Sequence, residues 1–129
     1  WMAEHHFQHE GYEVLPNSLM AAVHLCHFTE QLKIGCGFNI AQMCHPLRLA
    51  EDYALADLMT KGRTIFGVGR GYHSRGVETF GMPMVDQDAN RELFEEQVEV
   101  CLRLATKSRF PIRASTTSFR QKSHTVAAN

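Results

Sequence analysis

The segment LMTKGRTIFGVGRG, residues 58–71, carries the pattern that decides the fold. An apolar run over residues 63–69 ends in glycines that alternate with other residues. A dinucleotide-binding fingerprint needs G-x-G-x-x-G at the start of a helix, whereas here Gly67, Gly69 and Gly71 alternate and a polar loop follows. We therefore interpret the segment as a buried strand with a glycine-rich carboxyl end, and not as a Rossmann loop.

Helical patterns alternate with two such strands along the chain. Apolar residues at helical spacing predict three helices, and short apolar runs that end in glycine predict the strands. This order is typical of an α/β protein with a parallel sheet, in which ligands bind at the carboxyl ends of the strands. The predicted helices cover residues 17–29, 45–62 and 88–105, and the predicted strands cover residues 32–38 and 63–69.

Each predicted helix has an apolar face and local signals at its ends. Asn17 or Ser18 is the expected N-cap of the first helix, and Pro46 suits the first turn of the second. Gly62 is the expected C-terminal stop of the second helix. The three predicted faces are Leu19, Ala22, Val23 and Cys26; Leu47, Ala50, Ala54 and Leu58; and Phe94, Val98, Cys101, Leu102 and Ala105.

The composition is that of a soluble globular protein, with 44% hydrophobic and 21% charged residues. No apolar run approaches the roughly 20 residues of a membrane span, and the first residues lack a signal-peptide pattern. We therefore expect a cytoplasmic protein without membrane contact. The four cysteines form no C-x-x-C pair and lie in apolar segments, which predicts buried, reduced thiols.

The charge is unevenly distributed along the chain. Residues 1–105 hold 14 acidic and 8 basic residues, whereas residues 106–129 hold 5 basic residues and no acidic one. A basic tail is one feature of nucleic-acid binding, but this tail has neither helical nor alternating periodicity. No nucleic-acid partner is predicted.

Several residues are suited to chemistry. His5 lies in AEHHF directly after an expected strand end, where an imidazole serves as an acid or base. Arg70 follows the second strand between glycines, where a guanidinium grips a phosphate or pairs with a neighbouring carboxylate. Gly35 and Gly37 allow either close ligand approach or a bulge.

Histidines occur in close pairs, a feature that some metal sites share. His5 and His9 are four residues apart, and His24 and His27 form a second pair. The pattern is not H-E-x-x-H and offers no convergent third ligand, so no metal site is predicted. A small metal-binding module remains an alternative class, which zinc analysis of the chain would test.

The order and spacing of these motifs resemble one family. EHHF after a strand, HPLRLAED at a helix start, LMTKGR before FGVGRG, and a following FG are similar to bacterial-luciferase-like flavin-dependent monooxygenases, from Trp1 to about Ala105. The resemblance implies a (β/α)8 TIM barrel with reduced flavin at its carboxyl-end mouth. The chain would form about strands 2–4 and helices 2–4, with strand 2 closing at residues 1–3.

The resemblance also implies the site residues. His5 matches a catalytic histidine near the reactive edge of the flavin, and Gly37 and Phe38 match a strand end that often has a non-prolyl cis peptide behind the flavin ring. Arg70 matches the arginine that contacts the FMN phosphate. The implied reaction is oxygenation of a small organic substrate by O2 and reduced FMN through a C4a-peroxyflavin. An F420-dependent oxidoreductase and a non-catalytic luciferase-like flavoprotein remain alternatives.

A full barrel needs about 250 residues, so we expect a partial barrel over residues 1–105 that is inactive alone. The family resemblance implies a separate flavin reductase and, in the longer protein, a homodimer or heterodimer. The break in charge near residue 105 suggests a shifted reading frame, because regrouping the codons of residues 106–117 one base earlier permits a segment similar to the family. Stop codons or unrelated residues in that frame of the gene would contradict this idea.

Overall fold

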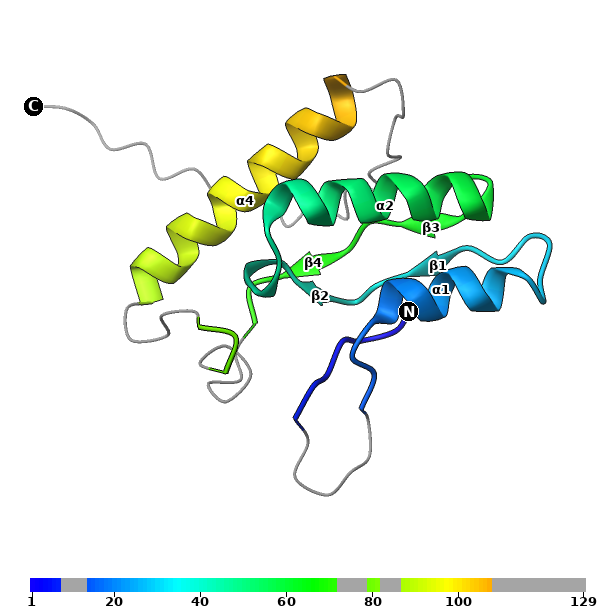
Figure 1. Cartoon of the computed structure of the whole chain (residues 1–129), viewed down its shortest axis with the longest axis horizontal. Helices are drawn as coiled ribbons and strands as arrows, with labels where there is room; N and C mark the ends of the chain where they lie inside the picture. Colours follow the sequence, from blue (N-terminus) through cyan, green and yellow to red (C-terminus); the bar gives the residue numbers. More distant parts are fainter. Residues whose placement is uncertain (8–13, 72–78, 82–86, 108–129) are drawn as a thin grey trace, which may run out of the picture.

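The computed structural model describes residues 1–7, 14–71, 79–81 and 87–107. Helices and short strands alternate, as predicted for an α/β protein (Figure 1). Each predicted helix is present. The strand predicted for residues 63–69 is present as two short pieces, and the strand predicted for residues 32–38 contains one piece, with a second directly after it. The elements are α1 (Ser18–Cys26), β1 (Ile34–Gly35), β2 (Asn39–Ile40), the 3-10 helix η1 (Ala41–Met43), α2 (Pro46–Thr60), β3 (Thr64–Ile65), β4 (Val68–Gly69) and α4 (Gln87–Lys107).

Three segments of the chain run parallel and side by side. β1 pairs with β3, and β2 pairs with β4. The first residues of the chain lie on the other side of β1, where Met2 forms a parallel bridge with Cys36. Met2 N donates to Gly35 O at 3.0 Å, and Gly37 N donates to Met2 O at 2.6 Å. The segments are therefore adjacent in the order in which they occur along the chain.

The prediction of a continuous strand over residues 32–38 is wrong in one respect, because a bulge interrupts the pairing with the neighbouring strand. Ile34 pairs with Thr64, but Asn39 pairs with Val68, so residues 36–38 lie opposite only residues 66–67. One extra residue reverses which side chains face each side of the sheet. As a result Asn39 is buried, whereas Phe38 is 57% exposed.

A close backbone contact explains a glycine at the bulge. A Cβ atom added to Gly67 would collide with the carbonyl oxygen of Cys36. Two backbones can approach this closely only where the side chain is absent. The second glycine of the predicted strand end, Gly69, leaves room for the side chain of Phe38, whose Cβ would lie 3.1 Å from an added Cβ.

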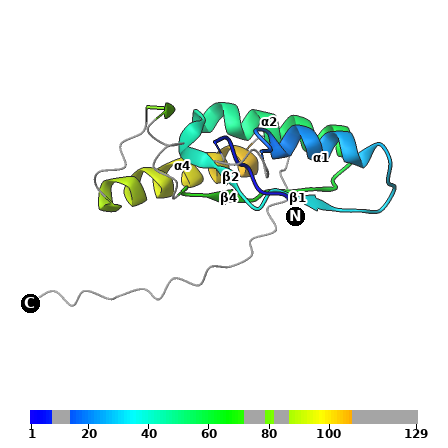
Figure 2. The same cartoon turned by 90° about the horizontal axis from the view of Figure 1, so that it is seen from below.

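The helices pack against the strands and against one another. In Figure 2, α1 and α2 lie on one side of the strands. Tyr53 of α2 is buried with Cys36, and Cys101 of α4 donates from Sγ to the carbonyl oxygen of Pro46 at 3.3 Å. A second, smaller core joins α1 to β1 through Ala22, Cys26 and Ile34.

The predictions for α1 and α4 are largely confirmed. Asn17 caps α1, because its Oδ1 accepts from Met20 N at 2.8 Å, and the predicted apolar face of α1 is buried or half-buried. α1 ends at Cys26, three residues before the predicted end. α4 is one residue longer at its start and two at its end than predicted, and its predicted face is also buried or half-buried.

The predicted face of α2 is confirmed only in part, because Ala50 is buried and Ala54 is half-buried but the two leucines are not. Leu47 and Leu58 are exposed, and the buried positions are Leu49, Ala50, Tyr53, Ala56 and Thr60. The helix has leucines on several sides, so apolar spacing alone did not identify the inner side. The burial of Tyr53, whose hydroxyl bonds to the strands, sets the observed face. The helix ends at Thr60, and Lys61 and Gly62 both have positive φ.

The predicted out-of-frame tail begins at residue 106, and from residue 108 it lies outside the described residues. No helix in the described part of the chain is both long enough and apolar enough to cross a membrane.

Candidate functional site

The predicted site residues lie at the carboxyl ends of the three parallel segments. His5 follows Glu4, whose backbone N donates to Phe38 O at 3.3 Å. Ile40 pairs with Gly69, the residue before Arg70. The register therefore brings His5, Phe38 and Arg70 to one edge of the sheet, from adjacent segments. This is the edge at which α/β proteins bind ligands.

The Gly37–Phe38 peptide bond is cis, as the resemblance implied. Phe38 lies beside Gly69, and the ring of Trp1 lies over Gly35 and Gly37. Both aromatic side chains are largely exposed, Trp1 to 72%. The glycines therefore let the two aromatic side chains lie against the backbone, and their exposed rings form a surface on which a flat aromatic group can stack.

His5 and Arg70 are both half-buried. The backbone of His5 pairs with Leu15 in an antiparallel bridge, with hydrogen bonds of 3.1 Å in both directions. This bridge holds the histidine at the strand end. Arg70 directly follows β4 and precedes Gly71, which has a φ of 76°. A guanidinium in this position is suited to an anionic group at the strand ends.

The sequence reasoning missed a buried polar network beneath this edge. Asn39 Nδ2 donates to Glu4 Oε2 at 2.5 Å and to Ser18 Oγ at 3.2 Å. The hydroxyl of Tyr53 lies 2.5 Å from Asn39 Oδ1 and 3.2 Å from the carbonyl oxygen of Gly67. The network joins all three parallel segments to α1 and α2. Asn39, a polar residue inside an otherwise apolar strand end, was the signal for it.

The acid–base states of the network follow from its burial. Burial first, and then the neighbouring Cys36 thiol, raises the pKa of Tyr53 far above its ordinary value. Tyr53 therefore remains a protonated donor. Burial also raises the pKa of Cys36, so this thiol stays uncharged at neutral pH.

The histidines considered for metal binding are not brought together. His24 is exposed on α1, as expected for a surface helix. His27, the C-cap residue of α1, is also exposed, and its Nδ1 lies 2.9 Å from the carbonyl oxygen of Val23. His9 lies outside the described residues. Among the residues that are described, no three His, Cys, Asp or Glu side chains converge as metal ligands would.

The cysteine prediction holds in part. All four thiols are free, and Cys26, Cys36 and Cys101 are buried. Cys44 is exposed, contrary to the prediction, because it follows η1 in the turn that leads into α2.

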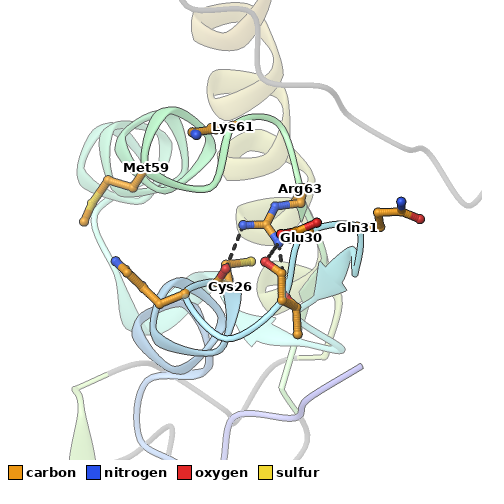
Figure 3. Close-up of a pocket in the computed structure, with 8 residues that line it drawn as sticks. Cys26, Glu30, Gln31, Met59, Lys61 and Arg63 are labelled. Carbon is orange, nitrogen blue, oxygen red and sulfur yellow. Dashed lines mark hydrogen bonds between the residues drawn. The ribbon is translucent and has the colours of Figure 1, made fainter.

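An open pocket of about 810 Å³ lies at the opposite end of the strands (Figure 3). One of the side chains that line it is Arg63, which precedes β3. The guanidinium donates to the carbonyl oxygens of Cys26, Thr29 and Thr60 at 2.7, 2.5 and 2.9 Å. Because these bonds join the ends of α1 and α2, Arg63 has a structural role, and the pocket is not the candidate site.

The fold and the strand-end site define an α/β protein whose candidate site lies at the carboxyl ends of parallel segments, and comparison with known proteins identifies the family. The family model of luciferase-like monooxygenases matches residues 1–127. The chain belongs to this family.

Individual relatives agree with this assignment. The chain is 37% identical over 92 residues to the alkanal monooxygenase alpha chain of Photorhabdus laumondii, which covers 71% of this chain and 25% of that protein. It is 31% identical over 95 residues to the oxygenase component of the flavin-dependent trigonelline monooxygenase of Acinetobacter baylyi, covering 74% and 26%. The chain thus spans about a quarter of the length of these relatives.

A solved structure has the same fold. The oxygenating constituent of 3,6-diketocamphane monooxygenase from Pseudomonas putida, a type II Baeyer-Villiger monooxygenase in complex with FMN, matches with a TM-score of 0.73. The match has 17% identity and covers 83% of this chain and 29% of that one. At this identity the match supports the fold alone.

Proposed function

We propose that this chain forms the flavin-binding edge of a (β/α)8 barrel monooxygenase that uses reduced FMN and O2 to oxygenate a small organic substrate. The observation that carries the proposal is the register that brings His5, Phe38 and Arg70 to the carboxyl ends of adjacent parallel segments. Such strand ends hold the ligands of barrel enzymes. Membership of the luciferase-like family supports the reaction class.

The described residues fit a flavin mononucleotide. Added Cβ atoms at Gly35, Gly37 and Gly69 would meet Trp1 or Phe38, so these glycines let two largely exposed aromatic side chains lie against the backbone, where they would offer the flavin ring an aromatic surface. Arg70 would hold the phosphate, because a guanidinium binds phosphate oxygens in a bidentate manner. Gly37 and Phe38 would back the flavin ring.

His5 would hold or move a proton beside the flavin ring, since an imidazole changes charge near neutral pH. When bound, the reduced flavin supplies the oxygen chemistry that no side chain can perform. The contribution of the protein is to bind, to orient and to exclude water. One relative is an oxygenase component, and we propose that a separate reductase likewise supplies reduced flavin here.

The test uses the chain joined to the coding sequence that flanks it in its gene, so that further barrel units are present. FMN and F420 are titrated separately, and oxygen consumption is followed with reduced flavin. We expect FMN binding with oxygen uptake, and loss of uptake in His5→Ala. Arg48→Ala, which removes an exposed arginine on α2, is the matched control for surface charge. F420 binding without oxygen uptake would contradict the proposal.

A further inference from the structure

The ring of His6 is held between a buried carboxylate and an aromatic ring. His6 Nε2 lies 2.6 Å from Glu4 Oε1, and the side chains of His6 and Glu4 are only 15% and 7% exposed. On another side, the ring of Phe80 makes an edge contact with His6, with a centroid distance of 5.1 Å. Glu4 and Phe80 therefore orient the ring of His6 from two sides.

The second carboxylate oxygen of Glu4 accepts hydrogen bonds from other groups. Glu4 Oε2 accepts from Asn39 Nδ2 at 2.5 Å and from the backbone N of Ile40 at 3.3 Å. Both of these groups can only donate. If the carboxylate turned toward His6 with both oxygens, two donors at the strand end would lose their acceptor, which is costly in a buried site. Glu4 therefore presents one oxygen to His6.

The orientation of Asn39 is itself fixed. Tyr53 is buried and protonated, so its hydroxyl donates to Asn39 Oδ1 at 2.5 Å. The amide nitrogen of Asn39 must then face Glu4. The result is a chain of fixed donors and acceptors from α2, through β2, to the carboxylate beside His6.

We propose that Glu4 is a positioning residue that holds the neutral form of His6 in the tautomer with the proton on Nε2, which leaves Nδ1 as the acceptor nitrogen of the ring. A carboxylate only accepts hydrogen bonds, so the nitrogen that faces it must carry the proton. The other nitrogen of a neutral imidazole is then the base. The use of this base rests on the proposed function, but the tautomer does not.

The tautomer can be measured directly on the full 129-residue chain without flavin. In ¹⁵N-labelled protein at alkaline pH, long-range ¹H–¹⁵N spectra separate protonated from unprotonated ring nitrogens, and His6→Gln identifies the signals of His6. We expect Nε2 of His6 to carry the proton. His27 serves as an internal reference for the other tautomer. Its Nδ1 faces the carbonyl oxygen of Val23, so Nδ1 is the nitrogen expected to carry the proton. A proton on Nδ1 of His6 would overturn the proposal.

Glu4→Gln gives a second and sharper result. The two donors on Asn39 and Ile40 require the oxygen of the new amide, so its NH2 group would face His6. We expect the tautomer of His6 to invert. Glu99→Gln, in an exposed ion pair with Arg103, should leave the tautomer unchanged. An unchanged tautomer in folded Glu4→Gln would overturn the proposal.

If circular dichroism shows that Glu4→Gln does not fold, the tautomer of His6 in the wild-type protein still tests the proposal. FMN binding by the wild-type protein is measured separately. Loss of the proposed function would therefore be distinguished from loss of the positioning role, because only the latter changes the spectra recorded without flavin.

Discussion

The side-chain amide of Asn39 donates to the carboxylate of Glu4 across 2.5 Å, although the two residues are 35 positions apart in the chain. This contact ties the first parallel segment to the second. The same amide group accepts from Tyr53, so α2 is part of the same network. The strand ends that carry the proposed flavin site are therefore held by polar contacts as well as by apolar packing.

Removal of Asn39 should weaken the fold more than its size suggests. Asn39→Ala removes the buried hydrogen bonds of Asn39 to Glu4, Ser18 and Tyr53, and we expect a loss of about 3 kcal/mol in the free energy of unfolding. Tyr53→Phe combined with Asn39→Ala should cost less than the sum of the two, by at least about 0.5 kcal/mol. Urea unfolding measures both. If the two losses in the free energy of unfolding simply add, a shared network is contradicted. The control is Tyr53→Phe combined with Arg103→Ala, two distant changes whose losses should add.

Arg63 should stabilise the end of the sheet opposite the proposed site. Its guanidinium holds the carbonyl oxygens at the ends of α1 and α2, a forked geometry that lysine cannot reproduce. We expect Arg63→Lys to lower the free energy of unfolding by about 2 kcal/mol. Arg103→Lys alters only an exposed pair with Glu99, which contributes about 0–1 kcal/mol. Equal losses in thermal unfolding would show that the forked contacts are not stabilising.

The two glycines beside the bulge should differ in their tolerance of a methyl group. At Gly67 the new Cβ meets the backbone of Cys36, which cannot move independently, so Gly67→Ala should cost about 3 kcal/mol or more. At Gly69 the nearest atom is the Cβ of Phe38 at 3.1 Å, a contact that a small shift relieves, and Gly69→Ala should cost roughly 1 kcal/mol. The reverse order in urea unfolding would contradict the observed backbone approach.

One thiol in four should react in the folded protein. Cys44 is exposed, whereas the other three thiols are buried. Although the residue is exposed, partial desolvation of its sulfur by surrounding atoms, and then Glu4 and Asp52, raises the pKa of Cys44, so less thiolate is present at neutral pH than in a free cysteine. The rate of alkylation by iodoacetamide should therefore continue to rise at pH values where a free cysteine has reached its plateau. Mass spectrometry after limited labelling checks the site, and Cys44→Ser should abolish the fast phase.

Local signals in the sequence predicted much of the fold. Asn17, Pro46 and the apolar faces of α1 and α4 depend on contacts near in sequence, and these predictions hold. The inner face of α2 was not predictable from leucine spacing, because it depends on where the Tyr53 hydroxyl meets the strands.

The candidate site was predictable only where a residue lies next to a strand end. The positions of His5 and Arg70 relative to the strands follow from the local pattern, and the resemblance gave the cis bond at Gly37–Phe38. The bulge that buries Asn39 arises from the pairing of distant segments. Because the stretch before Asn39 is rich in glycine, its side chains do not alternate between apolar and polar. The sequence therefore did not indicate that Asn39 would face the interior.

The central claim is that Arg70 holds the phosphate of FMN at this edge, and equilibrium binding tests it most directly. FMN and riboflavin, which lacks the phosphate, are titrated against the wild-type protein, Arg70→Ala and the control Arg48→Ala. We predict that Arg70→Ala weakens FMN binding at least about tenfold and leaves riboflavin binding unchanged. Equal FMN affinity in wild type and Arg70→Ala, or equal weakening of both ligands, would contradict the account.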